Sequence, residues 1–383
     1  MDTGTAYGRP QPTVRTDLTL VGAGTPMGEL LRRYWHPVGM SADASGTPKK
    51  VRALGEDLIL FRDTQGRPGL LYPRCAHRGA TLYYGKVEER GIRCCYHGWL
   101  YDINGKCLEQ PAEPADSTFK ERIKHPAYKV QELGGFIFAY LGPDPAPLMP
   151  RYDLLLEING ERVLGAGTEY CNWLQRAENS VDQTHLVALH APEYPQMALK
   201  RPEIGWEKTA YGAKITMHVP GVSKPKHSHW VFPSHTRHTT ARKGRIPDHA
   251  IRFRVPIDDT KTATFWLRFT PYSEGERGSP LVQKTIGFED DKPGVYSRVD
   301  DGWWGVASHD QDRVAQESQG EIYDRSKEHL GTADEGVILL RNLIMESIEA
   351  VRAGKDPFWT LRQPEQNDRI SFDASMAEIG ALA

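Results

Sequence analysis

The stretch CAHRGATLYYGKVEERGIRCCYHGWLYD, residues 75–102, contains two short clusters of potential metal ligands. Cys75 and His77 form a C-x-H cluster, and after the intervening residues 78–93 Cys94 and His97 form a C-x-x-H cluster. Thiolate and imidazole groups are the ligands that soft and borderline metals prefer. A glycine follows each histidine closely, which lets the backbone approach a bulky group. The spacing therefore predicts a metal site built from two loops.

Two kinds of metal site use this donor set. A single tetrahedral centre with mixed ligands would be structural zinc. A 2Fe–2S cluster with two cysteines on one iron and two histidines on the other would be a Rieske centre. Zinc fingers place like ligands together, whereas each loop here carries one ligand of each kind. The pattern favours the Rieske centre.

A further cysteine adjoins the second cluster. Cys95 also stands at Cys-x-His spacing from His97, so local spacing is ambiguous, and the C-x-x-H half-motif selects Cys94. On an extended backbone neighbouring side chains point to opposite sides. We therefore predict that Cys95 packs into the core as a small apolar residue.

The residues around these clusters predict an all-β unit. Short strand-like runs separated by Gly, Asn and Asp turns fill residues 50–145, and a helix is predicted over residues 24–35. The Pro-rich stretch 142–153 suggests a domain boundary. We assign residues 1–148 to an N-terminal helix plus a β domain.

The remaining residues, 149–383, combine helical and strand patterns. Helices are predicted over 171–190 and 334–354, and residues 250–257 and 262–269 alternate as two antiparallel strands around a short turn. The predicted fold class is α+β: an all-β domain followed by an α+β domain whose antiparallel sheet is flanked by helices.

Composition excludes several classes of protein. The 383 residues include 48 basic and 50 acidic side chains, so neither sign dominates and we expect no nucleic-acid or membrane-surface partner. The five cysteines form an odd set without a secretion signal, which indicates reduced thiols or metal ligands. No apolar run is long enough for a bilayer. We expect a cytoplasmic protein.

A second motif lies in the C-terminal half, where Asn179, Asp182, His185 and His190 follow one another at short intervals. Two histidines and a carboxylate form the facial triad of non-haem Fe(II) enzymes. Five residues turn an ideal helix by about 500°, so we expect the segment to bend or unwind between the histidines. Asp182 is better placed to accept the other N–H of His185 than to bind metal. The alternative is two ordinary polar residues at a helix end.

From about Gly24 to the C-terminal helix, the sequence resembles the Rieske non-haem iron oxygenases. The resemblance is closest to the branch of phthalate dioxygenase and dehydrodivanillate O-demethylase. Both motifs carry it, together with GTPMGELLRRYWHPV (24–38), RVPIDDTKTATFW (254–266) and DRSKEHLGTADEGV (324–337).

The resemblance implies a terminal oxygenase that uses O2 and electrons from NAD(P)H, delivered by a separate reductase or ferredoxin. In the first site, Cys75 and Cys94 would hold one iron and His77 and His97 the other. In the second, a mononuclear Fe(II) would be held by His185, His190 and a distant aspartate. Asp312 is the preferred third ligand, and Asp310 is the alternative.

The resemblance also implies how the two centres communicate. The counterpart of Asp182 links the mononuclear site to the Rieske centre of a neighbouring subunit, so a homotrimer, or stacked trimers, is expected. Asn179 is close enough in sequence to line the pocket.

The branch implies a small aromatic substrate that is carboxylated or carries O-methyl groups, as in the catabolism of aromatic compounds. Residues 227–245 are rich in histidine and arginine, and we predict that Arg237 or Arg242 anchors a carboxylate. A solvated loop is the alternative. The sequence leaves hydroxylation and O-demethylation open. The rival function is a non-catalytic Rieske electron carrier, which would explain residues 50–145 but not the histidine pair.

Overall fold

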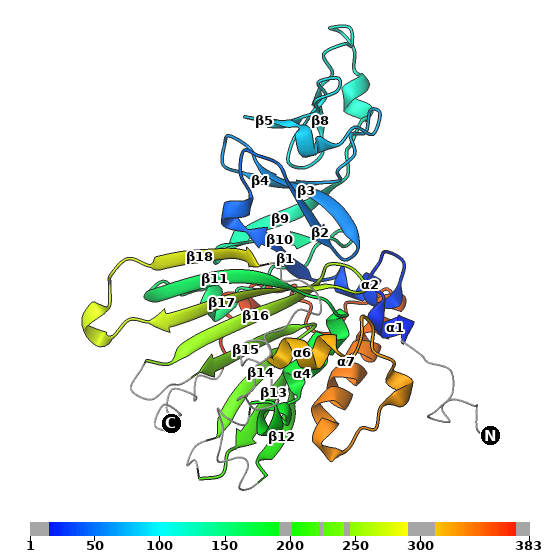
Figure 1. Ribbon diagram of the computed structural model, residues 1–383. Coiled ribbons are helices and arrows are strands. Elements are labelled where there is room, and N and C mark those ends of the chain that lie inside the picture. Colours follow the sequence, from blue (N-terminus) through cyan, green and yellow to red (C-terminus); the bar gives the residue numbers. More distant parts are fainter. Residues whose placement is uncertain (1–14, 191–200, 222–224, 241–245, 290–310, 373–383) are drawn as a thin grey trace, which may run out of the picture. The chain divides into compact units, whose positions relative to one another are not determined.

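The computed structural model describes residues 15–190, 201–221, 225–240, 246–289 and 311–372, and Figure 1 shows the course of the chain. The chain divides into two compact units. The β-rich unit comprises Arg32–Leu156 and Leu361–Arg369, and the mixed unit comprises the other described residues. Among the described residues, no helix combines the length and the apolar content that crossing a bilayer requires.

The first helical turns of the chain belong to the mixed unit. Helix α2 (Pro26–Leu31) buries Met27, Leu30 and Leu31 and packs against α7 (Glu335–Arg352). It is shorter than the predicted helix 24–35, because β1 (Trp35–Met40) begins soon after it. The predicted division at residue 148 stays a prediction, but the helix expected to accompany the β domain packs elsewhere.

The β-rich unit contains two antiparallel sheets, as the alternating short runs and turns predict. A six-stranded sheet has the order β1-β10-β9-β4-β3-β2, and a four-stranded sheet has the order β5-β6-β7-β8. The strands after β1 are β2 (Lys49–Ala53), β3 (Glu56–Arg62), β4 (Pro68–Leu71), β5 (Lys86–Glu88), β6 (Gly91–Arg93), β7 (Leu100–Tyr101), β8 (Cys107–Glu109), β9 (Ala127–Leu133) and β10 (Phe136–Tyr140).

The core of the β-rich unit reaches the two cysteine-histidine loops. Ile59 and Phe61 of β3, together with Ile92 and Tyr101, pack in one buried cluster that includes Cys75, Cys94 and Cys107. The first loop follows β4, and the second connects β6 to β7. The cysteine of each loop is therefore held in the buried core.

The mixed unit is built on one eight-stranded sheet with the order β12-β13-β14-β15-β16-β17-β11-β18. The predicted antiparallel pair is confirmed, since β16 and β17 pair antiparallel, from Pro256 opposite Thr262 to His249 opposite Phe269. At the other edge β11 and β18 pair in parallel. The strands are β11 (Gly160–Glu169), β12 (Glu203–Thr209), β13 (Gly212–His218), β14 (Lys226–Val231), β15 (His235–Thr240), β16 (Asp248–Pro256), β17 (Thr262–Pro271) and β18 (Val282–Glu289).

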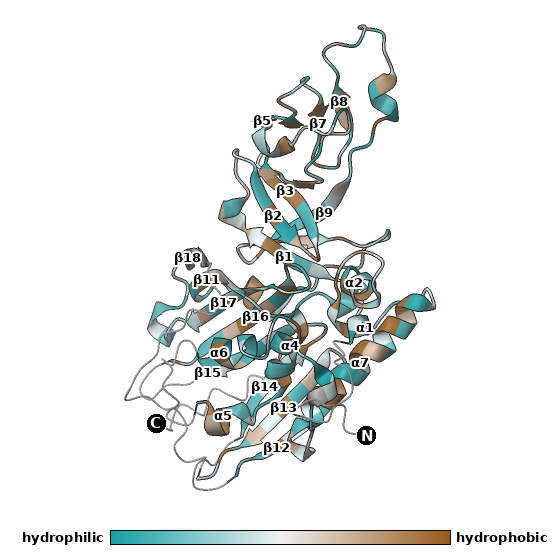
Figure 2. Cartoon of the chain, turned by 45° about the vertical axis from the view of Figure 1, so that its right-hand side comes forward, coloured by the Kyte–Doolittle hydropathy of each residue, from teal (hydrophilic) through white to brown (hydrophobic). Residues whose placement is uncertain are grey.

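Helices flank this sheet. Helix α4 (Trp173–Val181) contacts β16, and Figures 1 and 2 both show α4 and α6 (Gln311–Glu317) beside that part of the sheet. Helix α7 buries Val337, Leu340, Ile344 and Ile348, spaced by three or four residues, so apolar and polar residues alternate around it in Figure 2.

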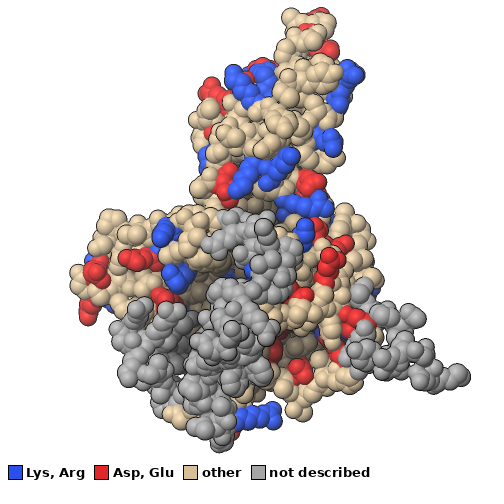
Figure 3. Space-filling model, viewed as in Figure 1, with Lys and Arg blue, Asp and Glu red and all other residues tan. Residues whose placement is uncertain are grey.

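Charged side chains of both signs are interspersed on the described surface of the face shown in Figure 3. This mixture agrees with the formal charge of −2. On that face the described residues form no extended patch of one sign.

Candidate functional site

The two cysteine-histidine loops have the same backbone hydrogen bonds. The N–H of Gly79 donates to the carbonyl of Cys75 over 2.9 Å, and the N–H of Gly98 donates to the carbonyl of Cys94 over 3.0 Å. Each cysteine N–H in turn donates to a carbonyl five residues later, over 2.8 Å in both loops. Gly79 and Gly98 have φ angles of 74° and 75°, a left-handed conformation that glycine adopts without strain. The two loops are thus matching turns.

The four predicted ligands lie in these turns. Cys75 and Cys94 are buried, and the rings of His77 and His97 lie 4.5 Å apart between centroids. Burial raises the pKa of the Cys94 thiol, although the backbone N–H groups of Tyr96 and His97 act in the opposite direction. Such N–H groups stabilise a thiolate bound to metal. The donor set of two thiols and two imidazoles on matching loops fits a 2Fe–2S cluster of the Rieske type.

The prediction for Cys95 is wrong. Its side chain is exposed, whereas Cys94 is only 3% exposed. The prediction assumed an extended backbone, but β6 ends at Arg93 and the chain from Cys95 to His97 forms a turn. Alternation of side chains applies only within a strand, so Cys95 points outward from the turn.

Two aromatic side chains beside this site were not singled out from the sequence. The ring of Trp99 stacks on His77 with an interplanar angle of 8°, and the hydroxyl of Tyr101 lies 3.1 Å from Sγ of Cys75. Both follow directly on the second loop, in the sequence WLY. Their proximity to a predicted ligand loop was the available signal.

The second predicted set of ligands also comes together. Oδ1 of Asp312 lies 3.2 Å from Nε2 of His190 and 3.7 Å from Nε2 of His185. One potential ligand atom from each residue lies within 4.8 Å of the others. Metal bonds of roughly 2.1 Å at right angles place neighbouring donors about 3 Å apart. These three side chains therefore fit one mononuclear metal ion.

The helical segment is interrupted twice. The predicted unwinding between His185 and His190 is present, since α5 (His185–Ala188) ends before His190, and a further break at residues 182–184 separates α5 from α4, which ends at Val181. His190 lies just beyond the end of α5. The break changes the direction of the chain before His185, and both imidazoles face Asp312.

Asp182 occupies this break. Its Oδ1 accepts hydrogen bonds from the N–H and the hydroxyl of Thr184, over 2.7 and 2.5 Å, and its Oδ2 lies 3.6 Å from Nδ1 of His185. Burial raises the pKa of Asp182, but interactions with His185 and Thr184 outweigh it and lower the pKa overall. Asp182 thus faces the nitrogen of His185 opposite to the one near Asp312, through a local turn rather than a shared helix face.

The charge of Asp312 is maintained by its neighbours. Burial raises the pKa of Asp312, but the hydrogen bond to His190 and the charges of His185 and Arg176 outweigh it and hold the pKa well below its ordinary range. The Asp312 side chain stays 41% exposed. An ionised and accessible carboxylate suits a metal centre that must leave positions open.

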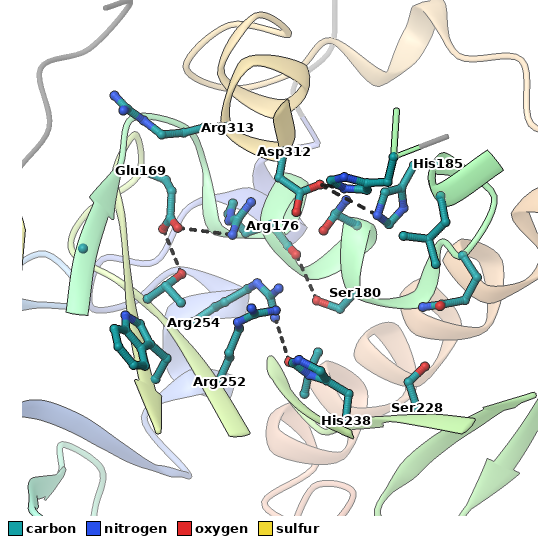
Figure 4. A pocket seen from close by; sticks show the side chains of 18 of the residues that line it. Glu169, Arg176, Ser180, His185, Ser228, His238, Arg252, Arg254, Asp312 and Arg313 are labelled. Carbon is teal, nitrogen blue, oxygen red and sulfur yellow. Dashed lines mark hydrogen bonds and ion pairs between the residues drawn. The ribbon is translucent and has the colours of Figure 1, made fainter. Parts of the chain in front are cut away.

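A cavity of about 540 Å³ adjoins these side chains. Its walls include Asn179, His185, His190 and Asp312, and Figure 4 shows part of the lining. Most other walls are polar, and Trp266 contributes an aromatic ring. The predicted place of Asn179 beside the second site therefore agrees with the lining.

The structure does not bring Arg237 to this cavity. Thr236 and His238 of β15 line it, and Arg237 between them points to the opposite face of the sheet, where its guanidinium contacts the carbonyl of His238 and Nδ1 of His249. Arg242 and the alternative ligand Asp310 lie outside the described residues. Strand alternation, which separates neighbours in sequence, is the reason that Arg237 is displaced.

Other arginines that the sequence reading did not select line the cavity instead. Arg252 and Arg254 of β16 share one face of the strand, because they are two residues apart, while Ile251, Phe253 and Val255 are buried. The predicted strand AIRFRVPI contained this signal, since its cations alternate with apolar residues.

Arg176 of α4 connects three elements at the second site. Its guanidinium pairs with Glu169 of β11 over 3.2 Å and donates to the side chain of Gln316 in α6. The neighbouring Gln175 donates to the carbonyls of Gln316 and Gly320, over 3.0 and 2.9 Å. These contacts hold α6, and with it Asp312, beside the segment that carries the histidines.

Comparison with known families and proteins places the chain among its relatives. Residues 34–128 match the family model described as Rieske [2Fe-2S] domain. The "Phenoxybenzoate dioxygenase subunit alpha" of Ectopseudomonas oleovorans is 36% identical over 92% of this chain and 89% of its own length. The "5,5'-dehydrodivanillate O-demethylase oxygenase subunit" of a Sphingobium species is 35% identical over 92% of this chain and 84% of its own length.

Among solved structures, the chain is similar to the Pseudomonas putida CBB5 NdmA QL mutant with theobromine. The TM-score is 0.66, and the match covers 85% of this chain and 93% of that one, at 22% sequence identity. This likeness concerns the fold.

Proposed function

Because the chain belongs to the oxygenase subunits of the Rieske non-haem iron oxygenases, we propose that its two candidate metal sites serve one oxidation of a small aromatic substrate. It is a terminal oxygenase component, which needs electrons from a reductase or ferredoxin partner. The alternative of a non-catalytic electron carrier has no use for the polar cavity beside His185, His190 and Asp312.

We assign Cys75, His77, Cys94 and His97 to the Rieske cluster, and His185, His190 and Asp312 to a mononuclear Fe(II). When bound, the cluster supplies electrons one at a time and the iron supplies the activation of O2. The matching turns and the three converging donor atoms support this assignment.

The protein's own residues orient these donors. The carboxylate of Asp182 lies 3.6 Å from Nδ1 of His185, which favours a proton on that nitrogen and leaves Nε2 for the iron, while Thr184 fixes the carboxylate of Asp182. Asn179 lines the cavity, where its amide can hydrogen-bond a substrate. The cavity walls hold the substrate next to the exposed part of the Asp312 side chain.

We further propose that the chain works as a homotrimer, in which Asp182 of one subunit links its His185 to a Rieske histidine of the next. The head-to-tail arrangement follows from the family resemblance, and the partial exposure of the Asp182 side chain is compatible with such a contact. Stacked trimers would be a variant of the same arrangement. The cytoplasmic location stays a prediction.

The proposed substrate is a carboxylated aromatic that is hydroxylated on the ring or loses an O-methyl group. In demethylation, one O2, two electrons and two protons convert an aryl methyl ether to a phenol, formaldehyde and water. One of the two relatives is named a dioxygenase and the other an O-demethylase, so we retain both reactions.

The observation that carries the function is the convergence of His185, His190 and Asp312 on one point of a cavity. It is tested by counting iron. The purified oxygenase should hold about three irons per chain, two in the cluster and one in the mononuclear site. His185→Ala should reduce the count to about two without changing the visible absorption of the cluster.

Activity is measured with a generic reductase, NADH and a panel of methoxylated and plain aromatic acids. Formaldehyde release would identify demethylation, and hydroxylated product without formaldehyde would identify ring oxidation. A wild-type count of about two irons, with no oxidation of any substrate, would instead support the electron carrier.

A further inference from the structure

Arg254 is a buried cation that forms no ion pair among the described residues. Its side chain is 3% exposed, and its described side-chain hydrogen bond is a long one, 3.5 Å, from a terminal nitrogen to the hydroxyl of Thr236. The Nε of Arg254 is buried without a hydrogen-bond acceptor. A buried guanidinium in this state carries a considerable desolvation cost. Natural proteins retain such a group where a ligand supplies the missing acceptor.

Arg252 adds a second positive charge on the same face of β16. Its side chain lines the cavity of about 540 Å³ and also an adjoining cavity of about 300 Å³, so water and ligands can reach it from both. Figure 4 shows Arg252 and Arg254 extending side by side from the sheet. Two neighbouring guanidinium groups offer several N–H donors, which suit the two oxygens of a carboxylate.

The acidic groups of the cavity are already engaged. Glu169 pairs with Arg176 and accepts from the hydroxyl of Thr264 over 2.8 Å, and Asp312 belongs to the metal site. Burial, followed by the charges of Arg176 and Arg252, lowers the pKa of Arg254 to about 9. The sheet side of the cavity is therefore short of negative charge.

We propose that Arg254, together with Arg252, binds a carboxylate of the substrate. The inference rests on the proposed oxygenase function and replaces Arg237 as the anchor. The proposal is more specific than a general attraction of anions to the cavity, because it places the carboxylate at the wall that the sheet forms. Ser180, Thr236 and His238 then surround the bound group with uncharged or weakly basic side chains.

This placement also determines which end of the substrate is oxidised. In Figure 4 Asp312 and His185 extend from helical segments toward the cavity, whereas the two arginines extend from the sheet. A substrate held by its carboxylate at Arg254 presents its opposite end to the metal ligands. An aromatic acid with a methoxy group para to the carboxylate should therefore be demethylated faster than its ortho isomer.

The test uses the full-length oxygenase with both metal sites loaded. Binding of 4-methoxybenzoate and biphenyl-4-carboxylate is compared with binding of the corresponding uncharged amides by calorimetry. The variants are Arg254→Gln, Arg254→Lys and Arg237→Gln. We expect Arg254→Gln to weaken the binding of the acids roughly 10- to 100-fold while changing the amides little, since a charge-assisted pair is lost. Arg254→Lys should retain part of the preference, because it keeps the charge without the fork.

Thermal unfolding without substrate separates binding from a structural role. Removing an unpaired buried charge should leave the melting temperature of Arg254→Gln unchanged or higher than that of the wild type. The stabilisation by 4-methoxybenzoate that we expect for the wild type should then be absent. A lower melting temperature with an unchanged preference for acids would overturn the inference, as would a preference lost in Arg237→Gln but kept in Arg254→Gln.

The outcomes also distinguish this inference from the proposed function. Turnover of methoxyarenes in which wild type prefers neither acid over its amide would overturn the anion site and leave the oxygenase intact. An iron count of about two with no oxygen consumption would contradict the oxygenase itself.

Discussion

The two candidate metal sites differ in how their ligands come together. Cys75, His77, Cys94 and His97 lie on two matching turns within residues 75–97, and both cysteines belong to one buried cluster. The second site joins His190 to Asp312, which are 122 positions apart. The first site therefore depends on local backbone geometry, and the second depends on contacts between distant elements. This difference predicts which substitutions should affect each site.

The largest expected effect separates the adjacent cysteines of the second turn. Cys94→Ser should abolish the visible absorption of the cluster, because a buried thiol would be replaced by a hydroxyl that binds iron poorly. Cys95→Ser should leave the absorption unchanged, because that side chain is exposed. Absorption spectra and iron counts of the two purified variants check this. Loss of the cluster in Cys95→Ser would reverse the assignment.

A mixing experiment tests whether the Rieske cluster of one subunit passes electrons to the mononuclear site of another. Subunits with Cys94→Ser keep the mononuclear site, and subunits with His185→Ala keep the cluster, so each variant alone should be inactive. In an equal mixture that assembles at random, roughly a quarter of the wild-type activity should return if electrons cross between neighbours. Electron transfer within one subunit would give no recovery after the same unfolding and reassembly. Wild-type protein taken through that procedure is the control.

A smaller effect should follow from loosening the contacts that hold α6. Arg176→Met removes both the pair with Glu169 and the hydrogen bond to Gln316. We expect the affinity of the mononuclear site for Fe(II) to fall roughly 10- to 100-fold, because the residues that contact metal ligands orient them. The absorption of the cluster should not change. Arg268→Met, at an exposed cation of β17, is the control. Equal iron affinity in the two variants would mean that Arg176 does not hold Asp312 in position.

The smallest effect concerns pH and the β-rich unit. His125 is fully buried with its Nε2 2.7 Å from the carbonyl of Tyr72, and burial lowers its pKa below 6.5. The folded state thus takes up a proton less readily than the unfolded state. Stability from the neutral imidazole is present above pH 6.5 and is lost as the pH falls from there toward the lowered pKa. Unfolding midpoints of wild type should drop more between pH 7 and pH 5 than those of His125→Gln. Parallel pH profiles would contradict this role for His125.

Sequence patterns predicted well which segments form strands and helices. They predicted less well in which direction single side chains point and where a helix breaks. The antiparallel pair β16 and β17 and helix α7 were predicted, because strand alternation and helical spacing are written in consecutive residues. The outward position of Cys95 was missed, since the strand ends one residue before Cys94. The end of the helix between His185 and His190 was predicted, but the earlier break at residues 182–184 was missed, because a break held by the Asp182–Thr184 turn leaves no periodic signal.

By itself, the sequence determined the family and proposed the ligand motifs, because the spacing of Cys, His and Asp within short segments reflects chemistry that a local backbone can satisfy. Only the tertiary structure decided which side chains share the cavity. It placed Asp312 beside two histidines far away in the chain, turned Arg237 away, and brought Arg252 and Arg254 to the same space. The physical reason is that strand pairing and helix packing select one face of each element, and that selection depends on partners distant in the sequence.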